Sequence, residues 1–250
     1  KKKLGIVDEL TKGIDFLFKK NKVTKYIGAA KILSPNEIEI MNSEKTDVIN
    51  ADKIIIATGS ESTNLPNINV DEKKIVTSTG ALELDKVPEK MIVIGAGIIG
   101  LEMGTVWRRL GAEVEVVEFL PRILPGLDGE IANNFMKILQ KQGVKFKLAH
   151  SVEKAKIIND KVLLSVKDIN KNTHNELEAD VALVSVGRKP NTNGLGLEKL
   201  NLKIDTHGFI ETNENFQTSV SNIYAIGDVI KGPMLAHKAE EDGVAAVEIM

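Results

Sequence analysis

The segment from residue 91 to residue 118 constrains the fold more than any other part of the sequence. It reads MIVIGAGIIGLEMGTVWRRLGAEVEVVE: four apolar residues, the glycine-rich sextet Gly95–Gly100, a helical pattern closed by Gly111, and a second apolar run that ends at Glu118. An apolar run, a glycine turn, a helix and another apolar run make a β-α-β unit, whose strands pair in parallel. The segment therefore predicts an α/β fold around a parallel sheet.

A second helix is expected after this unit. The apolar spacing predicts a helix from Leu127 to Gln142, ended by Gly143. The apolar face expected for this helix consists of Leu127, Ile131, Phe135, Ile138 and Leu139.

The following residues change from a helical period to a period of two. A strand is expected at 144–148 and a buried strand at 181–186, and between them Val162, Leu164 and Val166 alternate with polar residues, with a further run at 176–179. Strict alternation is typical of a strand with one buried face. The pattern predicts an antiparallel excursion that covers one face of the parallel sheet.

An internal repeat indicates that one α/β domain is inserted into another. DKIIIATGS begins at Asp52 and DVALVSVGR at Asp180, and each copy runs through a largely apolar strand into a glycine, Gly59 or Gly187. The two copies bracket the whole glycine-rich segment, so we expect the chain to leave the outer domain after the first copy and return after the second. The expected domains are 1–60 with 190–250, and the inserted 61–189.

The sextet GAGIIG also carries a chemical prediction. It follows a strand, opens a helix, and is followed 18 positions after Gly100 by Glu118 at the end of the next strand. Gly95 permits the turn, Gly97 lets the backbone approach a pyrophosphate, and Gly100 lets the helix pack closely on the strand. The helix N-terminus favours phosphate. Glu118 would accept from ribose hydroxyls and repel a 2′-phosphate, which favours NAD over NADP; the alternative is a domain that kept this loop without a ligand.

Three further polar residues have both an ordinary and a functional interpretation. Glu102 lies in the first turn of the predicted helix. Its carboxylate has two possible roles: to stabilise the helix N-terminus, or to stand beside a nicotinamide ring. Thr58 and Ser60 are ordinary turn residues or hydrogen-bond donors to a cofactor at a strand end.

Composition excludes several classes of function. The chain has no cysteine, its four histidines are scattered without metal-ligand spacing, and it has no GxSxG, so thiol, zinc and serine-hydrolase chemistry are excluded within these residues. The formal net charge of −2 gives no reason to expect a nucleic-acid or membrane partner. We expect a soluble, cytoplasmic protein, and we expect the 250 residues to be part of a longer chain.

Several separated motifs carry a resemblance to a known family. GAGIIGLEMGTVWRRLGAEVEVVEFLPRILPGLD, VGRKPNTNGLGLEKL and NIYAIGDVIKGPMLAHKAEEDG resemble the dihydrolipoamide dehydrogenase branch of the pyridine nucleotide–disulfide oxidoreductase family. The resemblance covers nearly the whole chain. It implies a doubly wound NAD-binding domain inserted into a partial FAD-binding domain of similar architecture.

The resemblance also implies the residues around each cofactor. For NAD these are Val93, Ile94, Gly95, Ala96, Gly97, Ile98, Ile99, Gly100, Glu118, Val152 and Gly187, with Glu102 supporting beside the nicotinamide. For FAD they are Ala30, Thr58, Gly59, Ser60, Asp228, Met234, Leu235, Ala236 and His237. Asp228 would hydrogen-bond the ribityl chain of FAD, whereas its residue type alone favours a carboxylate that caps the following turn.

The family's chemistry is oxidation of dihydrolipoamide through an active-site disulfide and FAD to NAD. The first FAD glycine motif, the cysteine pair and the histidine–glutamate base are missing, and the resemblance implies that they lie before Lys1 and after Met250. No catalytic residue is therefore expected here. The implied partners are a dihydrolipoyl domain of a 2-oxoacid dehydrogenase complex and a second subunit of a homodimer, in the mitochondrial matrix if the source is eukaryotic. The alternatives are a cysteine-independent flavin NADH reductase and a non-enzymatic NAD-binding module.

Overall fold

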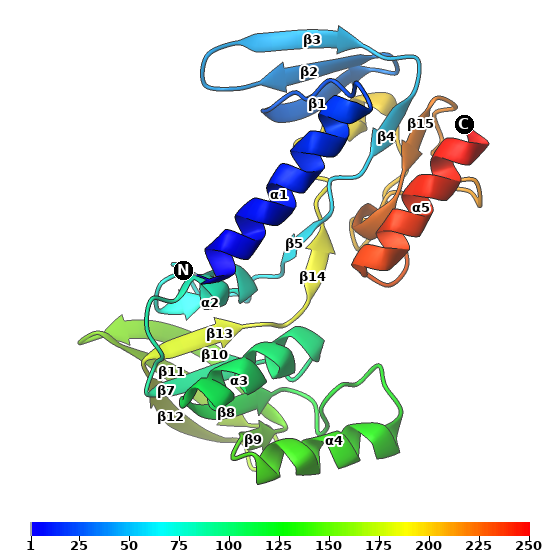
Figure 1. Ribbon diagram of the computed structural model, residues 1–250. Coiled ribbons are helices and arrows are strands. Elements are labelled where there is room, and N and C mark those ends of the chain that lie inside the picture. The colour runs from blue at the N-terminus through cyan, green and yellow to red at the C-terminus, as the bar shows by residue number, and fades with distance from the viewer. Residues whose placement is uncertain (1) are drawn as a thin grey trace. The chain divides into compact units, whose positions relative to one another are not determined.

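The chain divides into a continuous unit, Ser60–Lys189, and a split unit made of the residues before and after it. The computed structural model describes residues 2–250 and is shown in Figure 1. The chain enters the continuous unit through β5 (Ser60–Ser62) and leaves it through β14 (Arg188–Pro190), and these two strands pair with each other.

A five-stranded sheet in the order β6-β13-β7-β8-β9 forms the middle layer of the continuous unit, and all its strands are parallel. The strands are β6 (Ile75–Val76), β7 (Lys90–Ile94), β8 (Glu113–Glu118), β9 (Lys145–Leu148) and β13 (Val181–Val184). The prediction of an α/β fold with a parallel sheet is confirmed.

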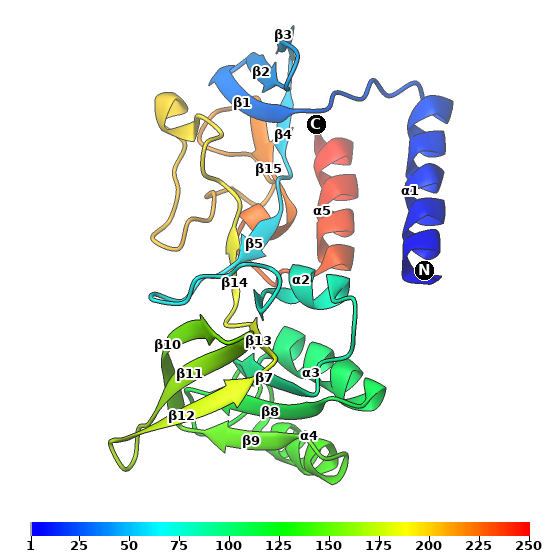
Figure 2. The same cartoon turned by 90° about the vertical axis from the view of Figure 1, so that its left-hand side faces the viewer.

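The two faces of this sheet bury alternate residues of its strands. Met91 and Val93 belong to the core on the helical side, and Ile92 and Ile94 belong to the core on the other side. The helices are α2 (Ser78–Glu83), α3 (Ile98–Leu110) and α4 (Gly129–Lys141). The opposite side is covered by an antiparallel sheet of β10 (His150–Ile158), β11 (Lys161–Asp168) and β12 (Thr173–Ala179), as Figure 2 shows.

The antiparallel sheet confirms the pattern of alternation. Val162, Leu164 and Val166 on β11 are buried and pack in the same core as Ile92 and Ile94. The strand β10, which lies along β11 with a bulge near Val152, has no clear apolar alternation and is not predicted by the sequence pattern.

The helix predicted from Leu127 begins two residues later, and its predicted face is partly wrong. Asp128 is the N-cap, since its carboxylate accepts hydrogen bonds from the N–H groups of Glu130 (2.9 Å) and Ile131 (3.1 Å). Leu127, Ile131 and Ile138 are exposed. The side chains that face the core are Ala132, Phe135, Met136 and Leu139. Phe135 and Leu139 thus face the core as predicted, but packing on the sheet turns Ala132 and Met136 inward in place of Ile131 and Ile138.

The split unit has its own core and two sheets. The antiparallel sheet contains β1 (Ala29–Ser34), β2 (Glu37–Met41) and β3 (Thr46–Asn50), and the parallel pair contains β4 (Ile54–Ile56) and β15 (Ile223–Ala225). The helical elements are α1 (Lys2–Lys20), η1 (Leu197–Leu200), η2 (Gly227–Val229) and α5 (Ala236–Ile249). No residue of α1 is buried. Among residues 2–250, no helix combines the length and the apolar character that crossing a membrane requires.

Candidate functional site

The glycine-rich loop lies at the carboxyl end of β7, between neighbouring strands. Gly95 follows β7 with a φ of +101°, and its N–H donates to Val117 O of β8 at 2.9 Å. Ser185, which follows β13 on the other side, donates from its N–H to Ile94 O at 2.9 Å. Because parallel strands end at one edge, the ends of β13, β7 and β8 meet there, and open α/β sheets bind ligands at this edge.

Packing explains two of the three glycines. A Cβ on Gly95 would stand 2.6 Å from Ser185 O, and a Cβ on Gly100 would stand 2.5 Å from Ser185 Oγ and closer still to Gly95 O. The Ser185 hydroxyl also donates to Ile94 O at 3.0 Å, so this side chain supports the loop from beneath. Sequence reasoning did not single out Ser185, although a polar residue at the end of a neighbouring apolar strand was a usable signal.

Packing does not explain Gly97. Its φ of −77° and ψ of −178° are open to any residue, and a Cβ there would meet no heavy atom within 4 Å. Gly97 is also the N-cap of α3, where no side chain caps the helix. The first turn of α3 therefore presents backbone N–H groups toward open space beside a bare glycine, which is the arrangement that receives phosphate groups.

Glu118 ends β8 beside the loop and is nearly buried. One carboxylate oxygen accepts from Ala96 N–H at 2.6 Å and the other from Leu120 N–H at 2.8 Å. A carboxylate has about four lone-pair positions, so two remain for further donors such as ribose hydroxyls. Glu118 thus also ties the glycine loop to the end of β8, a structural role that its position in the sequence did not reveal.

The segment after Glu118 closes against the same loop. Leu124, at a φ of +47°, donates its N–H to Ala96 O at 3.0 Å. The Arg122 guanidinium donates to Leu127 O at 2.6 Å, which holds the segment in its turn. The segment belongs to the surroundings of the loop, and the sequence pattern gave no sign of it.

The remaining residues predicted for NAD lie in the same unit. Val93, Ile94, Gly95, Ala96 and Gly100 are buried in or under the loop, Ile98 is exposed, and Ile99 is half-buried at the start of α3. Val152 lies on β10 and Gly187 after β13, with Gly187 O accepting from Thr63 N–H at 3.0 Å. Glu102 is exposed. The prediction that it lies in the first turn of α3 is wrong, because the helix begins at Ile98 and Glu102 is its fifth residue.

The residues predicted for FAD lie mostly around the strand ends of the split unit. Thr58 and Gly59 follow β4, and Gly227 and Asp228 follow the parallel strand β15. The Thr58 hydroxyl donates to Asn191 O at 2.6 Å, and Asn191 N–H donates to Gly59 O at 2.9 Å. Thr58 thus connects the end of β4 to the distant segment at Asn191.

The other predicted FAD residues are placed as follows. Ala30 lies on β1 opposite Ile40. Met234, Leu235, Ala236 and His237 lie at the start of α5, whose N-cap is Leu235 without a side-chain cap. Ser60 falls in the continuous unit, where its Oγ accepts from Arg188 Nε at 2.7 Å.

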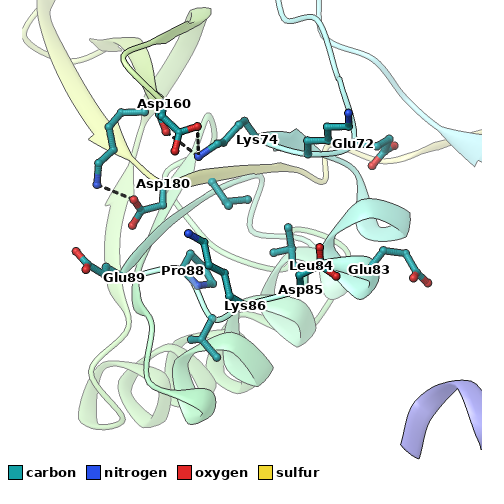
Figure 3. Close-up of a pocket in the computed structure, with 14 residues that line it drawn as sticks. Glu72, Lys74, Glu83, Leu84, Asp85, Lys86, Pro88, Glu89, Asp160 and Asp180 are labelled. Carbon is teal, nitrogen blue, oxygen red and sulfur yellow. Dashed lines mark hydrogen bonds and ion pairs between the residues drawn. The ribbon is translucent and has the colours of Figure 1, made fainter. Parts of the chain in front are cut away.

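The continuous unit also contains a cavity of about 530 Å³ that lies away from the glycine loop. Figure 3 shows its charged lining, in which Lys74 pairs with Asp160 at 2.9 Å and Lys161 pairs with Asp180 at 2.6 Å. Burial raises the pKa of Asp180, but hydrogen bonds from Lys161 and from Lys90 N–H lower it more, so the net pKa lies below the ordinary value. Most of the lining residues lie just before β6, β7 and β13, at the amino ends of these strands, whereas Asp160 lies in the turn between β10 and β11 and Lys161 is the first residue of β11. This edge is opposite to the one where such sheets bind nucleotides.

Comparisons with known proteins agree with this architecture. The family model described as pyridine nucleotide-disulphide oxidoreductase matches residues 2–243. The chain is 54% identical over 245 residues to the mitochondrial dihydrolipoyl dehydrogenase of Pisum sativum, covering 98% of this chain and 49% of that protein. It is 53% identical over 245 residues to a leghemoglobin reductase of Glycine max, covering 98% of this chain and 47% of that protein. It thus spans about half the length of the curated relatives it matches.

A solved structure shows the same fold. The Cu(II) complex of the HOCl-induced flavoprotein disulfide reductase RclA from Escherichia coli superposes with a TM-score of 0.82 and 26% identity, over 88% of this chain and 49% of that one. The family model covers almost the whole chain, and the relatives match it from end to end. The chain therefore belongs to the pyridine nucleotide-disulphide oxidoreductase family.

Proposed function

We propose that the continuous unit binds NAD at the glycine loop, and that the split unit supplies part of an FAD site. Gly97 is the observation that carries the NAD proposal. Neither its backbone conformation nor its packing requires a glycine, whereas Gly95 and Gly100 are explained by contacts inside the protein. A bare backbone beside open space and a helix N-terminus fits the close approach of a pyrophosphate.

Glu118 supports the choice of NAD. Its carboxylate is held in one orientation by two backbone N–H groups, and it retains lone pairs for the ribose hydroxyls. A 2′-phosphate at this position would face a nearly buried negative charge, which disfavours NADP.

The FAD proposal rests on the strand ends of the split unit. Asp228 follows β15 and Thr58 follows β4, so both stand at the ligand-binding edge of a parallel strand pair. We propose that Asp228 accepts a hydrogen bond from the ribityl chain, and that the start of α5, at Met234–His237, lies along the flavin. When bound, the flavin and the nicotinamide supply the hydride and electron transfer, while the residues of this chain bind and orient them.

For the whole protein we propose dihydrolipoamide dehydrogenase activity. Identity above 50% to a dihydrolipoyl dehydrogenase over nearly all of this chain supports it. A dihydrolipoyl domain of a 2-oxoacid dehydrogenase complex is the proposed partner, and a homodimer is the proposed assembly. The relative from Pisum sativum is named as mitochondrial, so we propose the mitochondrial matrix for a eukaryotic source and the cytoplasm otherwise.

Two glycine variants of the full-length protein test the NAD site as a matched pair. Gly97→Ala should melt at nearly the same temperature as the unmodified protein, because the added methyl group meets nothing, but it should bind NAD at least about tenfold more weakly. Gly100→Ala should lower the melting temperature, because its methyl group meets Gly95 O and Ser185 Oγ. Unchanged NAD affinity in Gly97→Ala, measured by calorimetric titration, would refute the site.

A second experiment tests the activity. The full-length protein should show flavin absorbance and should reduce NAD only when dihydrolipoamide is supplied. NADH oxidation by an artificial acceptor without any response to dihydrolipoamide would instead support a cysteine-independent flavin reductase. NAD binding without flavin would support a non-enzymatic module. Because the leghemoglobin reductase of Glycine max is about equally similar, a ferric haem protein should be included as a further acceptor.

A further inference from the structure

A buried carboxylate on α5 stands behind the Gly227–Asp228 turn. Asp242 is only 8% exposed, and a buried charge is costly unless it is paired and hydrogen-bonded. Its Oδ2 accepts from Lys238 Nζ at 2.6 Å and from Gly227 N–H at 3.0 Å. The two charged residues are one helical turn apart and face the same part of the chain.

Lys238 contacts the other side of the same glycine. Its Nζ donates to Gly227 O at 3.4 Å, so the Lys238–Asp242 pair engages both the N–H and the C=O of Gly227. These groups belong to the two peptide planes on either side of this residue. With both planes held, φ and ψ of Gly227 cannot change without breaking a charge-assisted hydrogen bond.

The glycine itself lies tightly against α5. Gly227 has a φ of +70°, and a Cβ at this position would stand 3.0 Å from the Cβ of Ala239. The left-handed conformation lets the backbone turn at the end of β15, and the absent side chain lets the turn rest on the helix. Asp228 is the next residue, so the position of its backbone and Cβ depends on φ and ψ of Gly227.

We propose that Lys238 and Asp242 form a clamp that positions Asp228 toward the ribityl chain of FAD. This inference rests on the FAD site proposed above. Simple stabilisation explains the pair less well, because a buried ion pair is often no more stabilising than apolar residues of the same size. Because the pair holds both peptide groups of Gly227, it restricts the conformation of that residue. Such a restriction favours binding when the ligand requires this conformation.

The test uses the full-length protein with the variants Lys238→Met and Asp242→Asn. Glu241→Gln, at an exposed position of the same helix, is the matched control. Each clamp variant should weaken flavin binding about tenfold, because one hydrogen bond to a charged group is lost, and the control should bind as the unmodified protein does. Hydrogen exchange in residues 223–230 should become faster in the clamp variants and stay unchanged in the control.

A double-variant cycle separates positioning from general stability. If the clamp acts through Asp228, combining Lys238→Met with Asp228→Asn should weaken flavin binding little more than Asp228→Asn alone. The visible circular dichroism of the bound flavin should change in the single variant Lys238→Met and in the single variant Asp228→Asn. Additive losses in the double variant, or unchanged flavin affinity in both clamp variants, would overturn the inference. If the unmodified protein binds no flavin, the proposed FAD site itself is refuted, and this result does not depend on the clamp variants.

Discussion

At the scale of single residues, Glu118 has a structural role in the glycine loop besides the binding role proposed for it. Glu118 was expected only to face a ribose, yet it accepts from Ala96 N–H and Leu120 N–H in the protein itself. The loop is therefore held in place before a nucleotide arrives. The carboxylate of Glu118 thus holds the loop, and in the proposed NAD site it would also accept from the ribose.

This double role changes what a substitution of Glu118 should do. Glu118→Arg should reduce the preference for NAD over NADP, and it should also cost about 1–3 kcal/mol of stability, because a buried backbone donor loses its acceptor. Glu118→Gln keeps one acceptor oxygen and should therefore lose less stability. The measurements are the ratio of kcat/KM for the two cofactors in the full-length enzyme, and thermal unfolding. Equal kinetics with NAD and NADP in the unmodified enzyme would contradict the assignment of Glu118.

Asp228 allows a similar prediction for flavin. A ribityl hydroxyl that donates to an ionised carboxylate contributes about 1.5–3 kcal/mol, so Asp228→Ala should retain flavin roughly ten- to a hundredfold more weakly. The fold should survive, because the predicted contact is with a ligand. Flavin content after dialysis of the full-length variant measures the effect, with circular dichroism as the folding control. A variant that keeps all its flavin argues against the contact, and one that unfolds favours a turn-capping role.

At the scale of elements, turns are held by carboxylates that accept from backbone N–H groups. Asp168 ends β11 and accepts from Asn170 N–H at 3.0 Å and Lys171 N–H at 3.1 Å. The hydrogen bond from Lys171 N–H is the largest cause of a pKa below the ordinary 3.8, followed among the lowering causes by Asn170 N–H. The folded protein thus prefers the ionised form, and the turn between β11 and β12 depends on that charge.

The pH dependence follows from the direction of this shift. Since the folded pKa of Asp168 is depressed, its stabilisation is fully present above about pH 3.8 and is lost as pH falls through the lower folded pKa. Asp168→Asn should therefore be less stable than the unmodified protein at pH 7, and the difference should shrink on acidification. Urea unfolding at several pH values tests this, with exposed Glu176→Gln on β12 as control. A difference that stays constant down to pH 2 would contradict the role of the charge.

At the scale of the whole molecule, this chain carries the residues proposed for an NAD site and for part of an FAD site, and it has no thiol. It contains no cysteine, and it spans about half of its curated relatives. In the proposed electron path a reducible disulfide accepts the first electrons, so the role proposed for the residues of this chain is to bind the cofactors and not to accept those electrons.

A purified fragment of residues 1–250 should accordingly show no dihydrolipoamide-dependent reduction of NAD, even with added FAD. The assay follows NADH absorbance, with the full-length protein measured in parallel. Thiol-dependent NADH formation by the fragment would overturn the proposed electron path.

The sequence by itself determined the features that depend on neighbours along the chain. The strand before the glycine sextet, the helix ended by Gly111, the strand ending at Glu118 and the alternation in β11 were all predicted, because apolar periodicity and glycine turns are local signals. The predicted start of α4 was wrong by two residues. The apolar pattern begins at Leu127, whereas Asp128 caps the helix and sets its first residue at Gly129. The exposure of Ile131 and Ile138 has a different origin, because packing of α4 on the sheet decides which of its faces is buried.

Only the tertiary structure decided the contacts between residues far apart in the chain. Ser185 supports Gly95 and Gly100, Glu118 reaches Ala96, and Asp242 holds Gly227 from α5. None of these pairs has a periodic signal, because each depends on which strands are neighbours and on how a helix packs against a turn. The sequence thus determined where the loop of each proposed cofactor site lies along the chain, and the packing of distant segments decided which side chains hold that loop.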